Sequence, residues 1–510
     1  MKKALFGMIY MSSYKIQLNI VNLFDLTIVE KLDSPSFVQA DSKRQVFEQD
    51  MDKICDAIEG FKLKLAEYQI KNYKFYGNGQ LIDEMSASFI ADQIKVRTGL
   101  NIEWLNEGQI IYAKVLSGLK SLDQNTETNK YNSTYLLSVG SAMVNLSLFR
   151  NRKFISSWSL PLGPREIQEL TEITNETPND PIDVTSDYLG AKIDHLARQI
   201  KDSSPCSVII QHADALNTVF LKKENSTNQI SREDFDQFYN QLIKMPINDM
   251  TQAYHLEPTV AVHTIPNAIS IHLFLSLLNV KNIFVTDLSV ITGLLMLEKK
   301  KPKPKITSND IIMTSAQNMA SWYLVDVHHA TQVRKFALHI FDRLRKIHLL
   351  SMQARTLLAL AATVDNIGSF VNQQRRYEQS AEIIDANKLI GLSDRDNEIV
   401  SEISRYQTIK DDHEAPNIGG HHYRHLSPDI QLEVAKLSAI LRLATALDAS
   451  HQQKIKKIVL SIKKNNQLII HAKTNSDITL ERWSFNKSAK LFEDVFGIKV
   501  ILKQEGMNRE

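Results

Sequence analysis

Carboxylates beside a predicted turn are the first residues whose type and spacing could do chemistry. Glu103 and Glu107 flank Trp104 just before a long apolar stretch. A carboxylate held there can act as a general base toward a water molecule. A lone glutamate is more often an ordinary surface side chain, and Asp365, at the end of a predicted helix, can cap that helix as well as bind a ligand. Spacing alone therefore leaves a catalytic and a structural reading of Glu107 open.

Histidines gather in one loop-like stretch, where two glycines precede the last three of them. The cluster consists of His413, His421, His422 and His425. Four imidazoles could hold a metal ion, but such clusters are more often exposed loop residues. No zinc spacing, phosphate-binding P-loop or dinucleotide glycine fingerprint occurs in the chain. The residues therefore predict no metal site.

A run of lysines and prolines at residues 299–305 follows a predicted helix. Proline cannot continue a helix, so the run is predicted to be a linker. It is either a solvated hinge or a polyanion-binding segment, for which Lys301, Lys303 and Lys305 are the candidates. A second basic set lies in the tail and consists of Lys454, Lys456, Lys457, Lys463 and Lys464.

The overall composition excludes several classes of protein. A chain of 510 residues exceeds one hydrophobic core, and a net charge of +2 gives no global attraction to nucleic acid. Two cysteines, Cys55 and Cys206, form no disulfide framework and fit a reducing cytoplasm. The apolar runs 268–280 and 288–297 are shorter than the ~20 residues that span a bilayer. We therefore expect a cytoplasmic protein without a membrane or nucleic-acid partner.

The order of the predicted elements favours an α/β fold in the first 300 residues and helices after it. Strands are predicted at 5–11, 15–24, 73–76, 135–149, 153–160, 207–211 and 282–286, and helices at 42–68, 81–98, 232–244, 268–278 and 290–298. Residues 313–450 are predicted to be helical, including 329–348, 351–363 and 432–447. The tail is predicted as strands at 457–462 and 467–472, a helix at 488–496 and a strand at 499–502.

Residues 9–18 carry an apolar frame with Tyr10, Ser12 and Gln17 at three polar positions. This frame resembles the phosphate loop Ile-Asp-Ile-Gly-Ser-Asn-Ser-x-Arg-Leu of the exopolyphosphatase / guanosine-pentaphosphate phosphohydrolase (Ppx/GppA) family. The Asp, Gly and Arg of that loop fall on the three residues named. The apolar frame is kept and the polar chemistry is not.

Residues 138–146 are similar to the second phosphate loop of the same family, Asp-Ile-Gly-Gly-Gly-Ser-Thr-Glu-Leu. Its Asp and Glu fall on Ser138 and Asn145, and Gly140 is the one glycine of three that is kept. The resemblance makes Ser12, Ser13, Gly140 and Ser141 the equivalents of the phosphate-loop residues.

Further motifs of the family follow in order. Thr-Gly-x-x-Ile is intact at residues 98–102, and Ser-Leu-Pro-Leu-Gly is intact at 159–163. The motif Gly-x-Glu-Glu-Ala resembles residues 106–108, where Glu107 is the one family carboxylate retained. Two motifs have lost their arginine, which falls on Ile82 and Ile291.

The helical third is similar to the family's HD-type domain. Its Ala-Ala-x-Leu-His-Asp-Ile-Gly falls on residues 361–368, where the metal-binding His-Asp pair has become Asp365-Asn366. Residues 441–448 closely match Leu-Arg-Leu-Ala-Asp-Ala-Leu-Asp. His329 and Asp448 are the polar residues that remain.

The resemblance implies a fold of four parts. They are an actin-like (ribonuclease H-like) ATPase-superfamily half with subdomains at 1–125 and 126–300, an all-α HD-like domain at 306–452 and a small α+β domain at 453–510. It also implies a hydrolase of phosphoric anhydrides. Because at least six groups for phosphate or Mg²⁺ are replaced, catalysis is expected to be lost.

Two functions stay open from the sequence. The first is a non-catalytic protein of polyphosphate or (p)ppGpp metabolism that binds polyphosphate or a guanosine phosphate, without a cofactor, and forms a homodimer or a heterodimer with a related protein. The second is an active exopolyphosphatase with a rearranged site built on Glu107, Asp83 or the His421 cluster. Magnesium is expected only in the second case.

Overall fold

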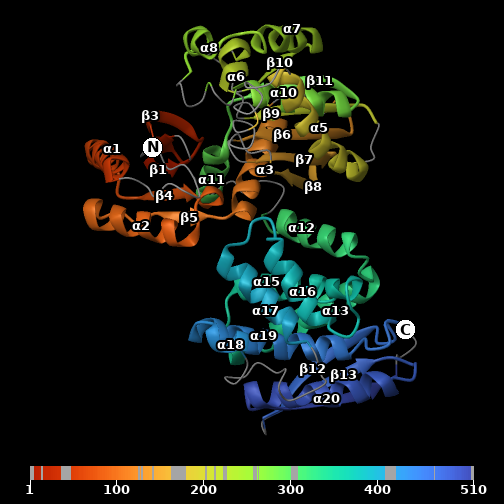
Figure 1. Cartoon of the computed structure of the whole chain (residues 1–510). Helices are drawn as coiled ribbons and strands as arrows, with labels where there is room; N and C mark the ends of the chain where they lie inside the picture. Colours follow the sequence, from red (N-terminus) through yellow and green to blue (C-terminus); the bar gives the residue numbers. More distant parts are fainter. Residues whose placement is uncertain are drawn as a thin grey trace. The chain divides into compact units, whose positions relative to one another are not determined.

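The computed structural model describes residues 5–12, 15–35, 48–124, 127, 130–140, 143–161, 170, 180–200, 204–211, 214–221, 227–256, 261, 264–299, 308–407, 421–463 and 466–506. The chain divides into two compact units, Met1–Thr307 and Ser308–Glu510 (Figure 1). The finer division into four domains stays a prediction.

The N-terminal unit begins with a mixed five-stranded sheet in the order β3-β2-β1-β4-β5. Its strands are β1 (Leu5–Met11), β2 (Lys15–Asn22), β3 (Thr27–Pro35), β4 (Tyr73–Asn78) and β5 (Glu103–Leu105). A short 3-10 helix, Gly79–Leu81, follows β4. Helices α1 (Glu48–Glu67) and α2 (Glu84–Thr98) bury Ile54, Ile58 and Ile94 against this sheet. Gly99 ends α2 in a left-handed conformation, φ 74°, which explains why the Thr-Gly pair is kept.

A second mixed sheet has six strands in the order β10-β11-β9-β6-β7-β8. Its strands are β6 (Ser133–Val139), β7 (Val144–Arg150), β8 (Lys153–Leu160), β9 (Cys206–Gln211), β10 (Thr227–Ile230) and β11 (Val280–Thr286). The helices that follow in this part are α5 (Pro181–Ile200), α6 (Asp214–Phe220), α7 (Arg232–Leu242), α8 (Ile247–Ala253) and α10 (Thr264–Leu277). The two sheets confirm the predicted α/β N-terminal half.

The predicted single strand over residues 135–149 is wrong. The run contains two antiparallel strands, β6 and β7, which reverse between Gly140 and Met143, where the Gly140 amide donates to the Met143 carbonyl over 3.1 Å. Both strands are buried on both faces, so the sequence lacks the alternation that would have exposed the turn.

Two helices lie between the sheets, as Figure 1 shows: α3 (Glu107–Gln124) and α11 (Val290–Glu298). Their apolar faces share a core with β1, in which Met8, Ala113 and Leu294 are buried. Glu107 was expected in a turn, but it is the first residue of α3. The turn is the single residue Asn106, which accepts from the Gln109 amide at the start of the helix.

The C-terminal unit is helical up to residue 446. Its helices are α12 (Ser308–Trp322), α13 (Val327–Arg343), α14 (Arg345–His348), α15 (Met352–Val364), the 3-10 helix Ile367–Phe370, α16 (Arg376–Ala386), α17 (Asp394–Arg405), α18 (His421–His425) and α19 (Pro428–Ala446). A three-stranded sheet follows, with β13 (Gln467–Lys473) between β12 (Lys457–Lys463) and β14 (Lys499–Glu505). The last helix, α20 (Thr479–Phe496), begins nine residues before the predicted start at 488.

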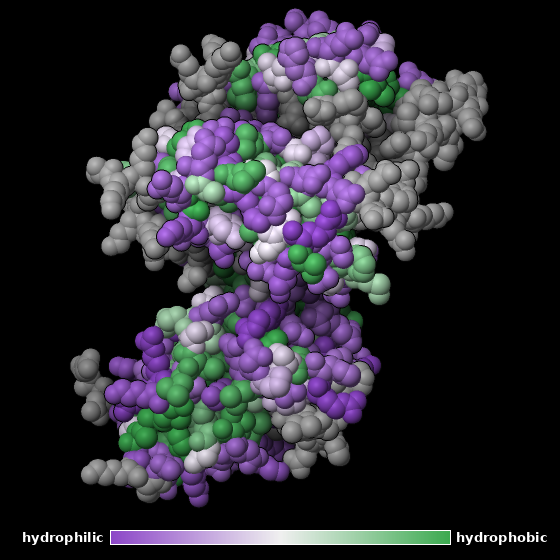
Figure 2. Space-filling model, turned by 90° about the vertical axis from the view of Figure 1, so that its left-hand side faces the viewer, coloured by the Kyte–Doolittle hydropathy of each residue, from purple (hydrophilic) through white to green (hydrophobic). Residues whose placement is uncertain are grey.

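The surface carries hydrophobic as well as polar side chains. The face drawn in Figure 2 has a continuous hydrophobic area on the C-terminal unit. Leu349 and Leu432 are among the large exposed hydrophobic residues of that unit. Within the described ranges, no helix is both long and apolar enough to cross a membrane.

Candidate functional site

A row of polar side chains crosses all six strands of the second sheet at one level. Strand register pairs each member directly with the next, so their side chains lie on one face. We call these residues the polar row: Ser159, Asn145, Ser138, Gln211, Thr286 and Thr227. Four of them are buried, and the row contains the two positions where the family's second loop has Asp and Glu.

Lys114 of α3 reaches this row. Its Nζ donates to Asn145 Oδ1 over 2.5 Å, and Asn145 Nδ2 donates to Ser159 Oγ over 2.8 Å. Only 6% of Lys114 is exposed. Burial lowers the pKa of Lys114 to about 8, although the negative charge of Glu107 acts in the opposite direction. A protonated ammonium thus lies at neutral pH where the family loop places a carboxylate.

The next turn of α3 is also connected to the row, through Ser117. Gln211 Nε2 donates to Ser117 Oγ over 2.7 Å, and that hydroxyl donates to the Lys114 carbonyl over 2.8 Å. Ser138 Oγ and Gln211 Oε1 are buried without a hydrogen-bond partner among the described residues. Each such buried group costs about 1–3 kcal/mol. The middle of the row therefore has unused hydrogen-bonding capacity next to a positive charge.

The sequence reasoning missed Lys114, Ser117 and Gln211. The available signal was a lysine inside the apolar run 110–116, because a charge in a buried helix face needs a partner. That signal does not identify the partner, since Asn145 is 31 residues away.

The structure brings two predicted site residues to this region. Gly140 directly follows β6, and a Cβ built on it would lie 3.8 Å from Lys114 Nζ. Glu107, half-buried at the start of α3, is close enough for its charge to act on Lys114. Among the described residues, Glu107 forms no hydrogen bond with the polar row.

Other candidates have local structural roles. Ser12 Oγ donates to the Lys15 carbonyl over 3.0 Å and so closes the β1–β2 turn. Asp83 caps α2 by accepting from the amide and hydroxyl of Ser86, which holds the pKa of Asp83 below its usual value. The predicted residues Ser13, Ser141, Lys301, Lys303 and Lys305 lie outside the described residues.

The histidine cluster is described only in part. His413 and the His421 side chain lie outside the described residues, and His422 and His425 belong to the short helix α18. Across the part of the chain that the structure describes, no three His, Cys, Asp or Glu side chains are grouped to hold a metal ion.

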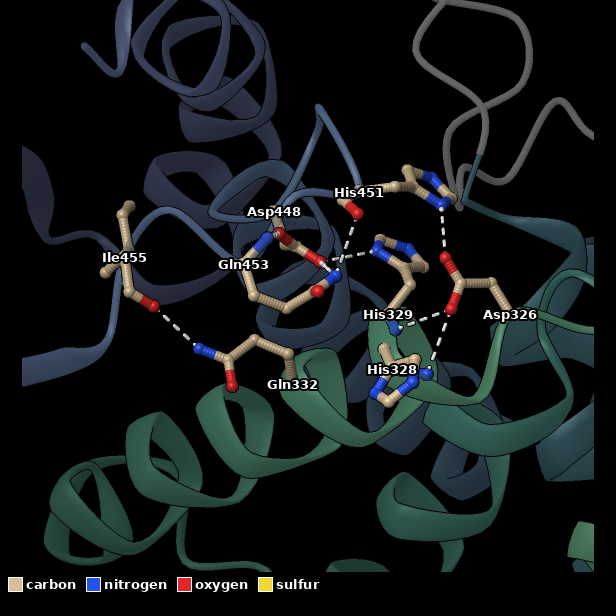
Figure 3. Close-up of polar contacts among 8 residues, drawn as sticks. All are labelled: Asp326, His328, His329, Gln332, Asp448, His451, Gln453 and Ile455. Carbon is tan, nitrogen blue, oxygen red and sulfur yellow. Dashed lines mark hydrogen bonds and ion pairs between the residues drawn. The ribbon is translucent and has the colours of Figure 1, made fainter. Parts of the chain in front are cut away.

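A second polar site lies in the C-terminal unit and joins the two residues that remain from the HD-type pattern. His329 Nδ1 and Asp448 Oδ2 are 2.9 Å apart, and both residues are buried (Figure 3). Asp448 also accepts from the backbone and side-chain amides of Gln453. The carboxylate is thus held by three donors and fixes the orientation of the imidazole.

His451 covers this pair from the solvent side. Its ring stacks on His329 with the centroids 3.6 Å apart and the planes 8° from parallel. Its Nδ1 lies 3.5 Å from Asp326 Oδ2, and Asp326 caps α13 by accepting from the amides of His328 and His329 (Figure 3). The pKa of His451 is lowered, first by burial and then by the charge of His329. Because the rings of His329 and His451 are parallel, their nitrogen lone pairs do not converge on one point. The two imidazoles are therefore poorly arranged to bind the same metal ion.

Asp365 lies near His329, and its raised pKa makes the free energy of unfolding depend on pH. Burial raises its pKa from 3.8 to about 6, although His329 and Arg376 act to lower it. Because the folded state holds this proton more tightly than the unfolded state, stability falls as the pH rises from about 4 to 6. We expect Asp365→Asn to be more stable than the wild type at pH 7, by up to roughly 3 kcal/mol, and equal to it near pH 4.

Urea unfolding at pH 4 and pH 7 tests this expectation. Asp342 provides a control of opposite sign, because Arg355 lowers its pKa, so Asp342→Asn should lose stability at pH 7. An Asp365→Asn variant with an unchanged difference from the wild type at both pH values would contradict the prediction.

Comparisons with known proteins add to this geometry. Residues 311–492 match the family model described as Ppx/GppA phosphatase, domain III. No curated protein matches the chain in sequence. A solved exopolyphosphatase from Cytophaga hutchinsonii is 15% identical, with a TM-score of 0.48 over 58% of this chain and 99% of that chain. The Ppx/GppA phosphatase of Aquifex aeolicus is 14% identical, with a TM-score of 0.46 over the same shares.

The matched range extends from within α12 to within α20. It contains His329, Asp365 and Asp448, which the structure brings into one neighbourhood. It also contains Arg442, which donates to the Tyr406 carbonyl and so connects two segments that resemble motifs of the family. The resemblance predicted from the sequence is thus confirmed for residues 311–492, which match domain III of the Ppx/GppA phosphatase family.

Proposed function

We propose that this chain is a non-catalytic Ppx/GppA-family protein, which keeps the fold in order to bind a phosphate polyanion or to assemble with a protein partner. The observation that carries the proposal is the Lys114 ammonium on Asn145, at the loop position where the family has a glutamate. The polyanion is polyphosphate or a guanosine phosphate, as the resemblance implies. The proposal includes the actin-like character of the N-terminal unit and the HD-like character of the helices.

The residues of the polar row do not fit Mg²⁺. Magnesium takes hard oxygen ligands in an octahedral arrangement and is usually held through one or two carboxylates. The row offers hydroxyl and amide groups and no carboxylate, and a fixed positive charge lies 2.5 Å from Asn145 Oδ1. An ion with two positive charges would be repelled there. We therefore derive no catalytic step through a metal at this row.

The C-terminal unit supports the same reading. Asp448 is occupied by His329 and Gln453, so its oxygens are engaged within the protein. Asn366 stands where the family pattern has an aspartate. We infer that the HD-like part holds no metal, in parallel with the polar row.

An assembly role is supported by the surface of the C-terminal unit. Large continuous hydrophobic areas on soluble proteins often mark interaction sites, and Figure 2 shows such an area on this unit. We propose that it takes part in a homodimer or in a heterodimer with a related protein.

Phosphate release from long-chain polyphosphate tests the proposal. We expect no release by the purified chain in the presence of Mg²⁺ or Mn²⁺ above that of a Glu107→Gln variant. The reason is that loss of a single group that stabilises charge costs about 10²–10³-fold, and this chain has lost several.

The rival function has a distinct signature in the same assay. Glu107 is the one candidate general base near the polar row, so turnover that is lost in Glu107→Gln would establish an active exopolyphosphatase with a rearranged site. That result would overturn the non-catalytic reading.

A further inference from the structure

The misfit between the polar row and Mg²⁺ has a specific consequence for how an anion would bind. We propose that Lys114 acts as a built-in cation, so that a phosphate-type oxyanion binds at the polar row without a divalent metal. This inference rests on the proposed non-catalytic binding function and deepens it, because it names the ligand chemistry of the same site and its independence of metal.

The ammonium of Lys114 has hydrogen-bonding capacity that the described residues do not use. An ammonium has three N–H donors. Among the described residues, the one hydrogen bond of Nζ goes to Asn145 Oδ1, which leaves two donors. Asn145 is itself fixed by Ser159, so the ammonium is held by a rigid partner. A lysine anchored in this way offers directed positive charge to an oxyanion.

Two further members of the polar row, Ser138 and Gln211, have unpartnered polar atoms near the ammonium. Ser138 lies beside Asn145 in register and is 1% exposed, and its hydroxyl has no hydrogen-bond partner in the described parts of the chain. A hydroxyl can donate to an oxyanion. Gln211, the next member of the row, has a free Oε1 that can accept from a protonated phosphate oxygen or from a bridging water.

Gly140 lies beside the ammonium, at the start of the loop between β6 and β7. Gly140 has no side chain, and a Cβ there would come within 3.8 Å of Lys114 Nζ. Gly140 is itself half-buried, so the backbone beside the ammonium is partly open to solvent at the end of β6.

The charge next to the polar row is positive. Lys114 is the one cation that hydrogen-bonds to the polar row among the described residues, and no carboxylate belongs to that row. The charge of Glu107 acts on Lys114, but Glu107 forms no hydrogen bond to the row within the described ranges. The ammonium of Lys114 and the unpartnered hydroxyl of Ser138 therefore favour an anion, since both can donate to the oxygens of a terminal phosphate.

Calorimetric titration of the full-length protein with tripolyphosphate, once in EDTA and once in magnesium, tests the inference. We expect binding in EDTA to be at least as tight as in magnesium, because magnesium ions complex tripolyphosphate in solution and compete for its oxygens. Guanosine tetraphosphate, titrated in the same way, distinguishes a nucleotide from an inorganic source of the phosphate group. Metal-independent binding of either probe supports the inference, and binding that appears only with magnesium overturns it.

Variants test the role of the lysine. We expect Lys114→Met to weaken binding about 10- to 100-fold, because a charge-assisted hydrogen bond is lost. Lys120→Met is the matched control, since Lys120 is a half-buried lysine of the same helix with no hydrogen bond to the row. Equal affinity of Lys114→Met and the wild type would overturn the inference. If the variant fails to fold, the comparison of buffers with the wild type still decides.

The same samples separate this inference from the proposed function. Phosphate release measured beside each titration reports catalysis. Absence of release together with magnesium-dependent binding, or with no binding at all, leaves the chain non-catalytic and rejects the role of Lys114. Release of phosphate rejects the proposed function itself.

Discussion

Replacing Gly293 by alanine is expected to destabilise the N-terminal unit by about 3 kcal/mol or more. A Cβ at this position of α11 would lie 1.8 Å from the carbonyl oxygen of Ala113 and 2.5 Å from its carbonyl carbon. These are backbone atoms of α3, so no rotation of a side chain can relieve the overlap. Overpacking typically costs 1–3 kcal/mol, and here two helices must separate.

Gly190 of α5 provides the matched control for Gly293. A Cβ on Gly190 meets nothing within 4 Å, so Gly190→Ala should gain roughly 0.5–1 kcal/mol from the lower flexibility of the unfolded chain. Urea unfolding, followed by hydrogen–deuterium exchange of peptides from α3 and α11, measures both variants. A Gly293→Ala protein as stable as the wild type would contradict the close approach of the helices.

The Gly293 variant also has a consequence for the polar row. Ala113 precedes Lys114, so displacement of α3 at this point moves the ammonium away from Asn145. We expect Gly293→Ala, if it folds, to bind tripolyphosphate more weakly than Gly190→Ala does.

Removal of the Asp448 carboxylate is expected to have the second large effect. Asp448 is 1% exposed and accepts from His329 Nδ1 and from two groups of Gln453. Asp448→Ala leaves these buried donors without an acceptor. Breaking a buried pair by removal of one partner costs about 3–5 kcal/mol, and we expect that loss in the unfolding of the C-terminal unit.

An exposed ion pair of the same unit serves as the control for Asp448. Asp429 lies 2.9 Å from Arg395 and is largely exposed, so Asp429→Ala should destabilise the unit far less than Asp448→Ala does. Hydrogen–deuterium exchange in peptides of α13 and α19 reports on the C-terminal unit specifically. Equal losses in the two variants would show that the buried pair contributes no more than a surface pair.

Much of the fold could be predicted from local patterns. The spacing of apolar residues predicted β1, β4, α11 and β12 close to their observed bounds, because side-chain periodicity is a local property. The same patterns failed where two buried strands are adjacent, at β6 and β7. The patterns also did not predict that Glu107 is the first residue of α3, which begins directly after the single turn residue Asn106.

The motifs that the chain keeps have packing roles that the structure explains. Gly293 allows the contact of α11 with α3. Gly368 lies where a Cβ would come within 2.0 Å of the Arg376 carbonyl oxygen, and its amide donates to Ser380 Oγ over 2.8 Å. Arg442 donates to the Tyr406 carbonyl. The residues that match the family's motifs are thus ones that allow close contact between backbone segments or hydrogen-bond to the backbone.

The sequence by itself determined the match of residues 311–492 to domain III of the Ppx/GppA phosphatases, the α/β character of the first half and the uncharged side chains at Tyr10, Ser138 and Asn145. Only the tertiary structure decided which side chains meet. His329 and Asp448 are 119 residues apart in sequence, and the polar row takes one residue from each of six strands. Strand register and the docking of α3 create these neighbours, and both depend on long-range packing that no local pattern records. For this reason Lys114, the residue on which the proposed chemistry rests, became evident only in the folded chain.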